Sequence, residues 1–315
     1  MRLSILVVSC DWKLLNSLLG SLAEATKLSS NDLEILCSWN GSPADEQKII
    51  NSSPYEFLIA QRLPYHFASN MNQLAGLAAG ELLMLVNDDI VLDPASIDAG
   101  IDCLTQEIKA GVVGGRLRNG SGQLVHAGML FDTKSSAYHQ LEHILPAKDQ
   151  SIINKNIAMP AITGALMFIR RIHFLQLKFN EKYIRCGEDV ELCLDIREKL
   201  TLKAYYSAKA SAIHEYSSTR QKKNLAGNNS EDLVRMRNRR RKFLEQISIE
   251  ELKDEMNASQ KESEALLSII RGDSKLEKDL KYWKNQTHSL QLHRIKQDQE
   301  ITRLKERINL QREEQ

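Results

Sequence analysis

Residues Glu81–Pro94 read Glu-Leu-Leu-Met-Leu-Val-Asn-Asp-Asp-Ile-Val-Leu-Asp-Pro, and the rest of the predicted fold is arranged around them. The apolar run Leu82–Val86 is typical of a buried parallel strand, and it ends abruptly in Asn87-Asp88-Asp89. Open α/β sheets bind ligands at the carboxyl edge, so this pattern predicts a ligand site. Adjacent carboxylates are accommodated best by a hard cation, Mg²⁺ or Mn²⁺, which bridges them to phosphates. The alternative is a strand that ends in a solvated turn, stopped by Asp93-Pro94.

The residues on either side predict alternating strands and helices. Strands are predicted at Leu3–Ser9, Leu33–Cys37 and Phe57–Ala60, and helices around Leu14–Leu22 and over Ala68–Gly80. A further helix is predicted over Asp93–Ala110, with Asp93 as its cap and Pro94 at its first position. This alternation predicts an α/β fold, a Rossmann-type, mostly parallel sheet flanked by helices.

The middle of the chain predicts a hairpin and further strands. Val112–Leu117 and Gln123–Leu130 are strand-like and are separated by the turn residues Asn119–Gly122. Ala161–Ile169 is again strand-like, and Gly164 within it permits close approach of another backbone or a ligand. After Gly187-Glu188-Asp189 we expect a helix over Val190–Lys199 and then two short strands, Lys203–Ala208 and Ala210–Ile213, before His214.

Composition narrows the class of protein. The 315 residues are 42% hydrophobic and carry a formal charge of +1, which is enough apolar material for a core and indicates no nucleic-acid partner. The five cysteines form no Cys-x-x-Cys pair, so neither a disulfide framework nor a zinc site is indicated. The apolar run Leu3–Val8 is too short for a signal peptide, and no run approaches the roughly 18 residues that span a bilayer. We therefore expect a cytoplasmic protein, at most peripheral at the inner face of the membrane.

The C-terminal part is polar and charged. Ser217–Asp232 predicts a mobile loop, either a lid or a plain connector. Arg235–Lys242 contains six basic residues, which fit a solvated helix face, a patch for anionic lipid or a lipid-linked acceptor, or a nucleic-acid contact. Interleaved aromatic residues are missing, which argues against nucleic acid. We predict a first domain over 1–246 and a helical tail over 247–315, whose 3-4 spacing from Leu276 to Ile308 leaves open a coiled coil and a homo-oligomer.

Three groups of polar residues end strands or open helices: Asn87-Asp88-Asp89, Glu188-Asp189 and His214. In a single α/β layer all three converge on one edge of the sheet. A carboxylate there can accept a proton from an attacking hydroxyl, although Glu188 and Asp189 can equally be residues that stabilise a helix N-terminus. A lone histidine such as His214 can equally be a hydrogen-bonded structural residue.

In this order, the segments resemble the inverting nucleotide-sugar glycosyltransferases of family 2, which have the GT-A fold. The resemblance covers roughly Arg2 to Ser218. The segments that carry it are Leu3–Ser9, Leu82–Asp89, Gly115–Gly128, Ile162–Ala165, Phe179–Leu194 and Ala212–His214. The ordered set is specific, whereas each segment alone is not.

The resemblance implies a role for each matching residue. Asp89, the last residue of a D-x-D-type element, would bind the metal ion, and Asp88 would contact the metal or the nucleotide ribose. Asp189, which follows Glu188, would be the base that deprotonates the acceptor hydroxyl, and His214 would join the metal or diphosphate site. The residues implied on the side of the nucleotide-sugar donor are Ser9, Asp11, Asn40, Asp88, Thr163 and Gly164.

Two positions depart from the family pattern. Relatives usually have Asp after the second strand, where it recognises the nucleotide base, whereas Trp39 stands here. In place of that Asp, Trp39 could stack on the base and Asn40 could hydrogen-bond the base or the ribose. Ser9-Cys10-Asp11 also replaces the commoner Thr-Tyr-Asn-like turn. The sequence therefore leaves the base of the nucleotide open.

We expect a metal-dependent, inverting glycosyltransferase of the hexosyltransferase type. It would move a sugar from a nucleotide-diphosphate donor to a hydroxyl of a glycan or lipid-linked acceptor, in the synthesis of a surface polysaccharide or glycan. One alternative is a nucleotidyltransferase, which gives no reason for Glu188-Asp189. The other is a non-catalytic, glycosyltransferase-like scaffold that assembles through the helical tail, which the departure at Trp39 favours.

Overall fold

The structure is a computed structural model that describes residues 2–144, 154–214 and 230–271. The chain forms two compact units, Met1–Glu262 and Ser263–Gln315. Only residues 263–271 of the second unit are described, and they are the C-terminal part of helix α9 (Ile249–Arg271). The predicted 3-4 spacing of the tail and residues 217–229 of the predicted loop lie outside the described residues. The last three residues of that predicted loop, 230–232, instead begin helix α8 (Ser230–Leu244).

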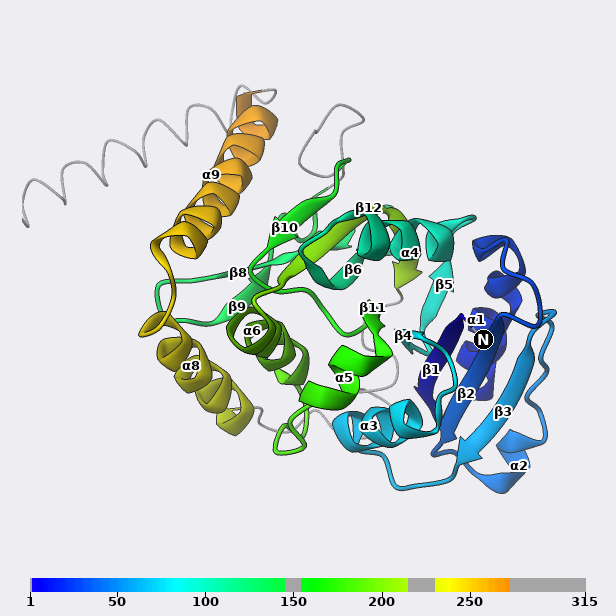
Figure 1. Ribbon diagram of the computed structural model, residues 1–315. Helices are drawn as coiled ribbons and strands as arrows, with labels where there is room; N and C mark the ends of the chain where they lie inside the picture. The colour runs from blue at the N-terminus through cyan, green and yellow to red at the C-terminus, as the bar shows by residue number, and fades with distance from the viewer. Residues whose placement is uncertain (1, 145–153, 215–229, 272–315) are drawn as a thin grey trace, which may run out of the picture. The chain divides into compact units, whose positions relative to one another are not determined.

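A mostly parallel sheet runs through the first unit (Figure 1). Its strand order is β10-β12-β6-β11-β4-β1-β2-β3, with β5 paired to β12 and β7 paired to β6. The strands are β1 (Leu3–Ser9), β2 (Leu33–Trp39), β3 (Glu56–Gln61), β4 (Leu82–Asn87), β5 (Ile90–Leu92), β6 (Ala110–Arg118), β7 (Leu124–His126), β10 (Ile157–Met159), β11 (Leu166–Arg170) and β12 (Lys203–His214). β11 is antiparallel to both of its neighbours, β4 and β6. A separate antiparallel ribbon joins β8 (Met129–Phe131) to β9 (Ala137–His139).

Helices cover the sheet in two groups. α1 (Trp12–Ala25) and α4 (Ser96–Gln106) pack together over one face, with α4 against β6, β11 and β12. The second group is α3 (Phe67–Leu77), α5 (Arg171–Leu177) and α6 (Glu188–Leu200), and α8 (Ser230–Leu244) packs on α6. A short helix, α2 (Pro43–Glu46), follows β2. The predicted fold class, an α/β sheet flanked by helices, is confirmed.

Burial explains why the central strands could be recognised. Every residue of β1 is buried, and β4 is buried up to its last residue, Asn87, so both are continuous apolar runs. In α1 the buried residues Leu15, Leu18 and Leu22 recur at three- and four-residue intervals, which places them on one face of the helix. A continuous apolar run therefore indicates a central strand, and apolar residues at three- and four-residue intervals indicate a helix packed on the sheet.

Two predicted strands are divided or joined differently in the structure. The sequence predicts one returning strand over Gln123–Leu130, but the chain bends at Gly128, which has φ 101°, and forms β7 and β8. A Cβ at Gly128 would lie 2.7 Å from the side chain of Met159, so only glycine fits this bend. Conversely, the two short strands predicted before His214 are one strand, β12, with a register shift between Ser207 and Ser211.

Asp93 does not cap a helix, contrary to the sequence-based expectation. Helix α4 begins later, after Ala95, which has φ 59° and makes no side-chain capping bond. Asp93 instead accepts two hydrogen bonds from the guanidinium of Arg118, at 2.5 and 2.6 Å, and one from the hydroxyl of Ser211. A bidentate arginine pair is stronger than a single capping bond, so Asp93 joins the end of β5 to β6 and β12. Burial raises the pKa of Asp93, but the bonds from Arg118 and Ser211 outweigh it and lower the pKa below its usual value.

Replacing Asp93 with Asn should therefore destabilise the protein. The substitution leaves the Arg118 guanidinium without its anion, and we expect the free energy of unfolding to fall by about 2–3 kcal/mol at neutral pH, measured by urea denaturation. The control is Asp102→Asn, an exposed carboxylate on α4, which should change it by less than about 0.5 kcal/mol.

Comparing the unsubstituted protein with Asp93→Asn at different pH values tests whether folding lowers the pKa of Asp93. Because the pKa of Asp93 is lower in the folded state than in the unfolded state, its contribution is fully present above about pH 4 and is lost as the pH falls through the folded-state pKa. The stabilities of the unsubstituted protein and Asp93→Asn should therefore converge in acid. A gap of constant size down to about pH 2 would contradict this assignment.

Candidate functional site

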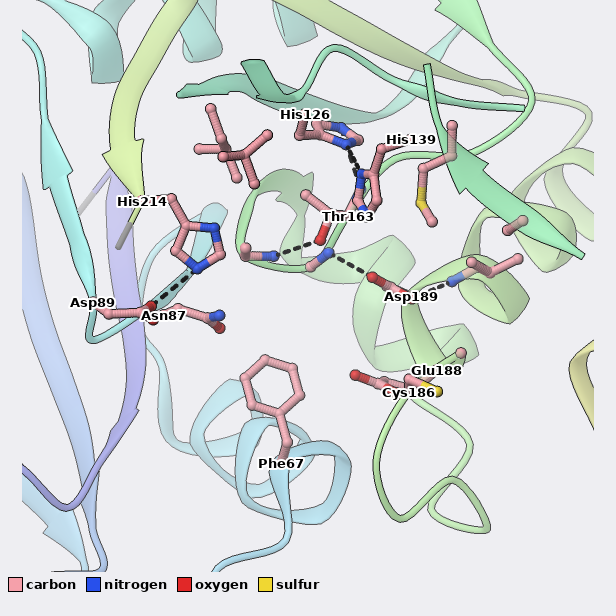
Figure 2. Close-up of a pocket in the computed structure, with 18 of the residues that line it drawn as sticks. Phe67, Asn87, Asp89, His126, His139, Thr163, Cys186, Glu188, Asp189 and His214 are labelled. Carbon is pink, nitrogen blue, oxygen red and sulfur yellow. Dashed lines mark hydrogen bonds and ion pairs between the residues drawn. The ribbon is translucent and has the colours of Figure 1, made fainter. Parts of the chain in front are cut away.

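A cavity of about 390 Å³ lies at the carboxyl edge of the sheet, where α/β folds bind ligands (Figure 2). Strand ends, the turn before β11 and the first turn of α6 all contribute to its wall. Its polar lining residues include Asn87, Asp88, Asp89, His126, His139, Thr163, Glu188, Asp189 and His214. The structure thus brings the three groups singled out in the sequence to one cavity.

Asp89 and His214 face each other because β5 pairs with β12. In this antiparallel register Ile90 lies opposite His214, which places the histidine beside the preceding residue, Asp89. The Nε2 atom of His214 is 3.1 Å from Oδ1 of Asp89 (Figure 2), and the two residues are 8% and 7% exposed. One carboxylate and one imidazole are therefore held together at the cavity wall.

Ser9 supports Asp88 from the neighbouring strand. β1 and β4 are parallel, and the hydroxyl of Ser9 donates a hydrogen bond of 2.7 Å to Oδ2 of Asp88. Asp88 lines the cavity, whereas Ser9 is 1% exposed and is not part of the lining. Ser9 therefore orients Asp88, and its predicted contact with the donor stays a prediction.

Asp189 opens α6 with its carboxylate fixed by two amides. The N–H of Gly164 donates to Oδ2 at 2.9 Å, and the N–H of Val190 donates to Oδ1 at 2.8 Å. The helix is preceded by Gly187, which has φ 106° and where a Cβ would lie 2.8 Å from the ring of Tyr183. Glu188, the other residue of the pair, is 7% exposed and also lines the cavity. The turn at Thr163–Gly164 therefore holds the carboxylate that the resemblance identifies as the base.

Asp232, which the sequence analysis assigned to the end of a loop and gave no role in the site, holds the segment before Asp189. The carboxylate of Asp232, in the first turn of α8, accepts hydrogen bonds from the backbone N–H groups of Ile184, Arg185 and Cys186, at 3.1, 2.7 and 3.3 Å. Asp232 is only 4% exposed. Sequence reasoning had no signal for it, because nothing local links an acidic residue of α8 to a loop some distance earlier in the chain.

Two further cavity residues, His126 and His139, had no role assigned from the sequence. Their Nδ1 atoms lie 2.8 Å apart, and burial lowers the pKa of both imidazoles (Figure 2). His139 reaches the cavity because β9 pairs with β8, opposite Met129. The only sequence signal was the position of His126 inside one of the resembling segments.

The residues predicted to contact the nucleotide do not all reach the cavity. Asp11 caps α1, where its side chain accepts hydrogen bonds from the N–H groups of Lys13 and Leu14. Asn40 donates to the carbonyl of Leu63, and its buried Oδ1 has no hydrogen-bond partner among the described residues. Neither Asp11 nor Asn40 lines the cavity, so their donor contacts stay predictions.

Trp39 cannot stack on a nucleotide base in this structure, so that expectation is wrong. The residue is 2% exposed and belongs to the hydrophobic core, with its indole N–H donating to the carbonyl of Ser42. A Cβ at Gly41 would collide with the Trp39 ring at 2.3 Å, which shows how closely the backbone covers it.

The side chains of Asp89 and His214 could bind a divalent cation whose remaining ligands come from a bound substrate. In the described part of the chain, no group of three or more His, Cys, Asp or Glu side chains is placed to hold a metal ion. The Oδ1 atom of Asp89 is buried and accepts no hydrogen bond from a described residue, although it lies close to His214. Magnesium and manganese sites that include substrate phosphates often need only one or two protein ligands. Asp89 and His214 therefore fit such an ion, and they do not form a complete protein cage.

The basic segment Arg235–Lys242 does not form a single exposed patch. Four of its six cations are engaged within the first unit: Arg235 with Asp232, Arg237 with Ser136, Arg239 with Asp195, and Arg240 with Glu255. Arg241 and Lys242 are exposed. A membrane contact by this segment would therefore rest on two cations. No helix within the described ranges is long and apolar enough to cross a bilayer.

Comparison with known sequences gives a partial match. No protein family model matches the chain. Over 163 residues it is 30% identical to the O-antigen biosynthesis protein RfbC of Myxococcus xanthus, a match that spans 50% of this chain but only 12% of that protein.

Solved structures with low sequence identity to this chain have a similar fold. GalNAc-T7 with UDP, GalNAc and Mn²⁺ aligns with a TM-score of 0.52 and 14% identity, covering 68% of this chain and 44% of that one. The mannosyltransferase PcManGT from Pyrobaculum calidifontis, in complex with GDP-Man and Mn²⁺, aligns with a TM-score of 0.48 and 12% identity, covering 90% and 79%. The match to GalNAc-T7 shows that the chain has the fold that the sequence resemblance implied, the GT-A fold.

Proposed function

We propose that the protein is a metal-dependent, inverting glycosyltransferase that moves a sugar from a nucleotide-diphosphate donor to a hydroxyl of a glycan or lipid-linked acceptor. The observation that carries this proposal is the placement of Asp89 with His214 at one end of a cavity and Asp189 at the other, at the carboxyl edge of a GT-A sheet (Figure 2). The partial match to an O-antigen biosynthesis protein supports a role in surface polysaccharide synthesis.

The donor would lie at the end of the cavity that Asp88, Asp89 and His214 form. Asp89 and His214 would hold Mg²⁺ or Mn²⁺, whose charge stabilises the leaving diphosphate. Asp88, oriented by Ser9, would contact the metal or the nucleotide ribose. The turn at Thr163–Gly164 lines the cavity between the two ends, where the transferred sugar would lie.

The acceptor would approach from the Asp189 end. Its hydroxyl oxygen forms the new bond to the anomeric carbon while the bond from that carbon to the diphosphate breaks, and Asp189 takes the hydroxyl proton. The two amides that bind Asp189 keep its carboxylate turned to the cavity. Because the nucleophile and the leaving group occupy opposite ends, the transfer inverts the anomeric centre.

Nucleotide binding should raise the melting temperature of the purified full-length protein. One nucleotide among UDP, GDP, CDP and dTDP should give a shift of about 5 °C in the presence of Mn²⁺, at a concentration about 100 times its Kd, because it binds only the native state. Asp89→Ala should lose the Mn²⁺-dependent part of this shift, and the exposed-site control Asp102→Ala should keep it. Absence of a shift with every nucleotide would favour the non-catalytic scaffold.

Replacing the proposed base should remove turnover and leave nucleotide binding in place. Asp189→Asn should lower the release of nucleoside diphosphate from nucleotide sugars about 10²- to 10⁴-fold, while the melting shift with nucleotide and Mn²⁺ persists. Glu188→Gln is the matched comparison, since it neutralises the neighbouring carboxylate. A larger loss in Glu188→Gln would transfer the role of base to Glu188. Release of pyrophosphate from a nucleoside triphosphate and a sugar 1-phosphate, with no turnover of nucleotide sugars, would instead identify a nucleotidyltransferase.

A further inference from the structure

The backbone fixes the tautomer of His126. Its Nε2 atom accepts hydrogen bonds from the N–H of Gly128, at 3.3 Å, and from the N–H of Thr163, at 3.5 Å. An imidazole nitrogen that accepts hydrogen bonds carries no proton, so neutral His126 must carry its proton on Nδ1. His126 is fully buried, and burial lowers its pKa well below the usual value, which agrees with a neutral ring.

That proton in turn fixes the tautomer of His139. The two Nδ1 atoms are 2.8 Å apart, and a single proton lies between them. Because His126 supplies it, His139 accepts at Nδ1 and carries its own proton on Nε2. Protonating His139 at Nδ1 would set two N–H groups against each other, so the pair resists becoming cationic. His139 Nε2 makes no hydrogen bond to any residue that the structure describes.

His139 and Asp189 belong to the same end of the cavity. Figure 2 shows both on the side away from Asp89 and His214. One turn serves both: the amide of Thr163 donates to His126, and the next amide, that of Gly164, donates to Asp189. Two consecutive peptide groups therefore fix the position of the Asp189 carboxylate and, through His126, that of the His139 N–H donor.

We propose that His139 is an acceptor-binding residue whose Nε2–H donates a hydrogen bond to a hydroxyl oxygen of the acceptor sugar, next to the hydroxyl that Asp189 deprotonates. This inference rests on the proposed function and adds the chemistry of its acceptor. A donor that cannot change tautomer recognises an oxygen lone pair and disfavours an amine or amide N–H at the same place. The acceptor is accordingly a sugar with at least two neighbouring hydroxyls. His126 is the positioning residue that sets the tautomer.

The tautomers can be read directly by long-range ¹H–¹⁵N spectroscopy of the full-length, ¹⁵N-histidine-labelled protein. At about pH 7 we expect His139 to be protonated at Nε2 only and His126 at Nδ1 only, with signals assigned from the His139→Gln and His126→Gln proteins. A His139 ring protonated at Nδ1, or a cationic ring, would overturn the proposal. This measurement does not depend on any enzymatic activity.

Transfer to methyl glycosides tests the binding role. With the nucleotide sugar that the protein turns over, His139→Ala should raise the KM for the methyl glycoside about tenfold and lower the ratio of transfer to hydrolysis by water by a similar factor. His139→Gln keeps an N–H near the place of Nε2 and should recover most of the loss. His143→Ala, an exposed histidine of the same segment, should behave like the unsubstituted protein.

The outcomes separate the two proposals. An unchanged KM for the methyl glycoside in His139→Ala would overturn the acceptor role while leaving the proposed function intact. Equal loss of transfer and hydrolysis in both His139 variants, with a lowered melting temperature, would show a purely structural role. An unsubstituted protein that turns over no nucleotide sugar would overturn the proposed function and the acceptor role together, while the spectrum would still report the tautomers.

Discussion

The cavity depends on one hydrogen bond of 3.0 Å, from the amide of Asn87 to the carbonyl of Ala165. This bond continues the antiparallel ladder in which Val86 pairs with Leu166. Because β11 runs against its neighbours, it enters the sheet at the edge where the parallel strands end, so a tight turn lies there. Two amides of that turn make no ladder hydrogen bond: that of Gly164 binds the carboxylate of Asp189, and that of Thr163 binds the imidazole of His126. If the strand at this place were parallel to β4, its C-terminal end would lie at this edge, and the turn that precedes it would lie at the opposite edge.

The sequence was informative wherever local pattern and position in the sheet coincide. The strands β1 and β4 are almost wholly buried, so their apolar runs specify both their type and their central place. Parallel strands end at a common edge, and for that reason the convergence of Asp89, Asp189 and His214 could be anticipated from strand ends and a helix start. The assignment of roles within that group comes from the resemblance.

The sequence was uninformative wherever a contact joins distant segments. Nothing local to Asp93 distinguishes a helix cap from a partner of Arg118, since both need a carboxylate after a short strand. Trp39 was misjudged because a large aromatic residue after a strand is compatible with a base platform and with the core alike, and burial alone separates them. His139 reaches the cavity through the β8–β9 ribbon, whose pairing no periodicity in that polar stretch indicates.

The contact of Asp232 with the loop at 184–186 sets a lower limit on the length of chain that keeps the cavity intact. A chain cut after His214 would retain every residue to which the resemblance gives a role, and sequence alignment alone would judge it complete. Yet it would lose the buried carboxylate that gathers three peptide N–H groups immediately before Gly187, together with Met236, which lines the cavity. The smallest fragment that keeps the cavity intact is therefore longer than the set of resembling segments, and truncation in search of a minimal domain has to stop beyond α8.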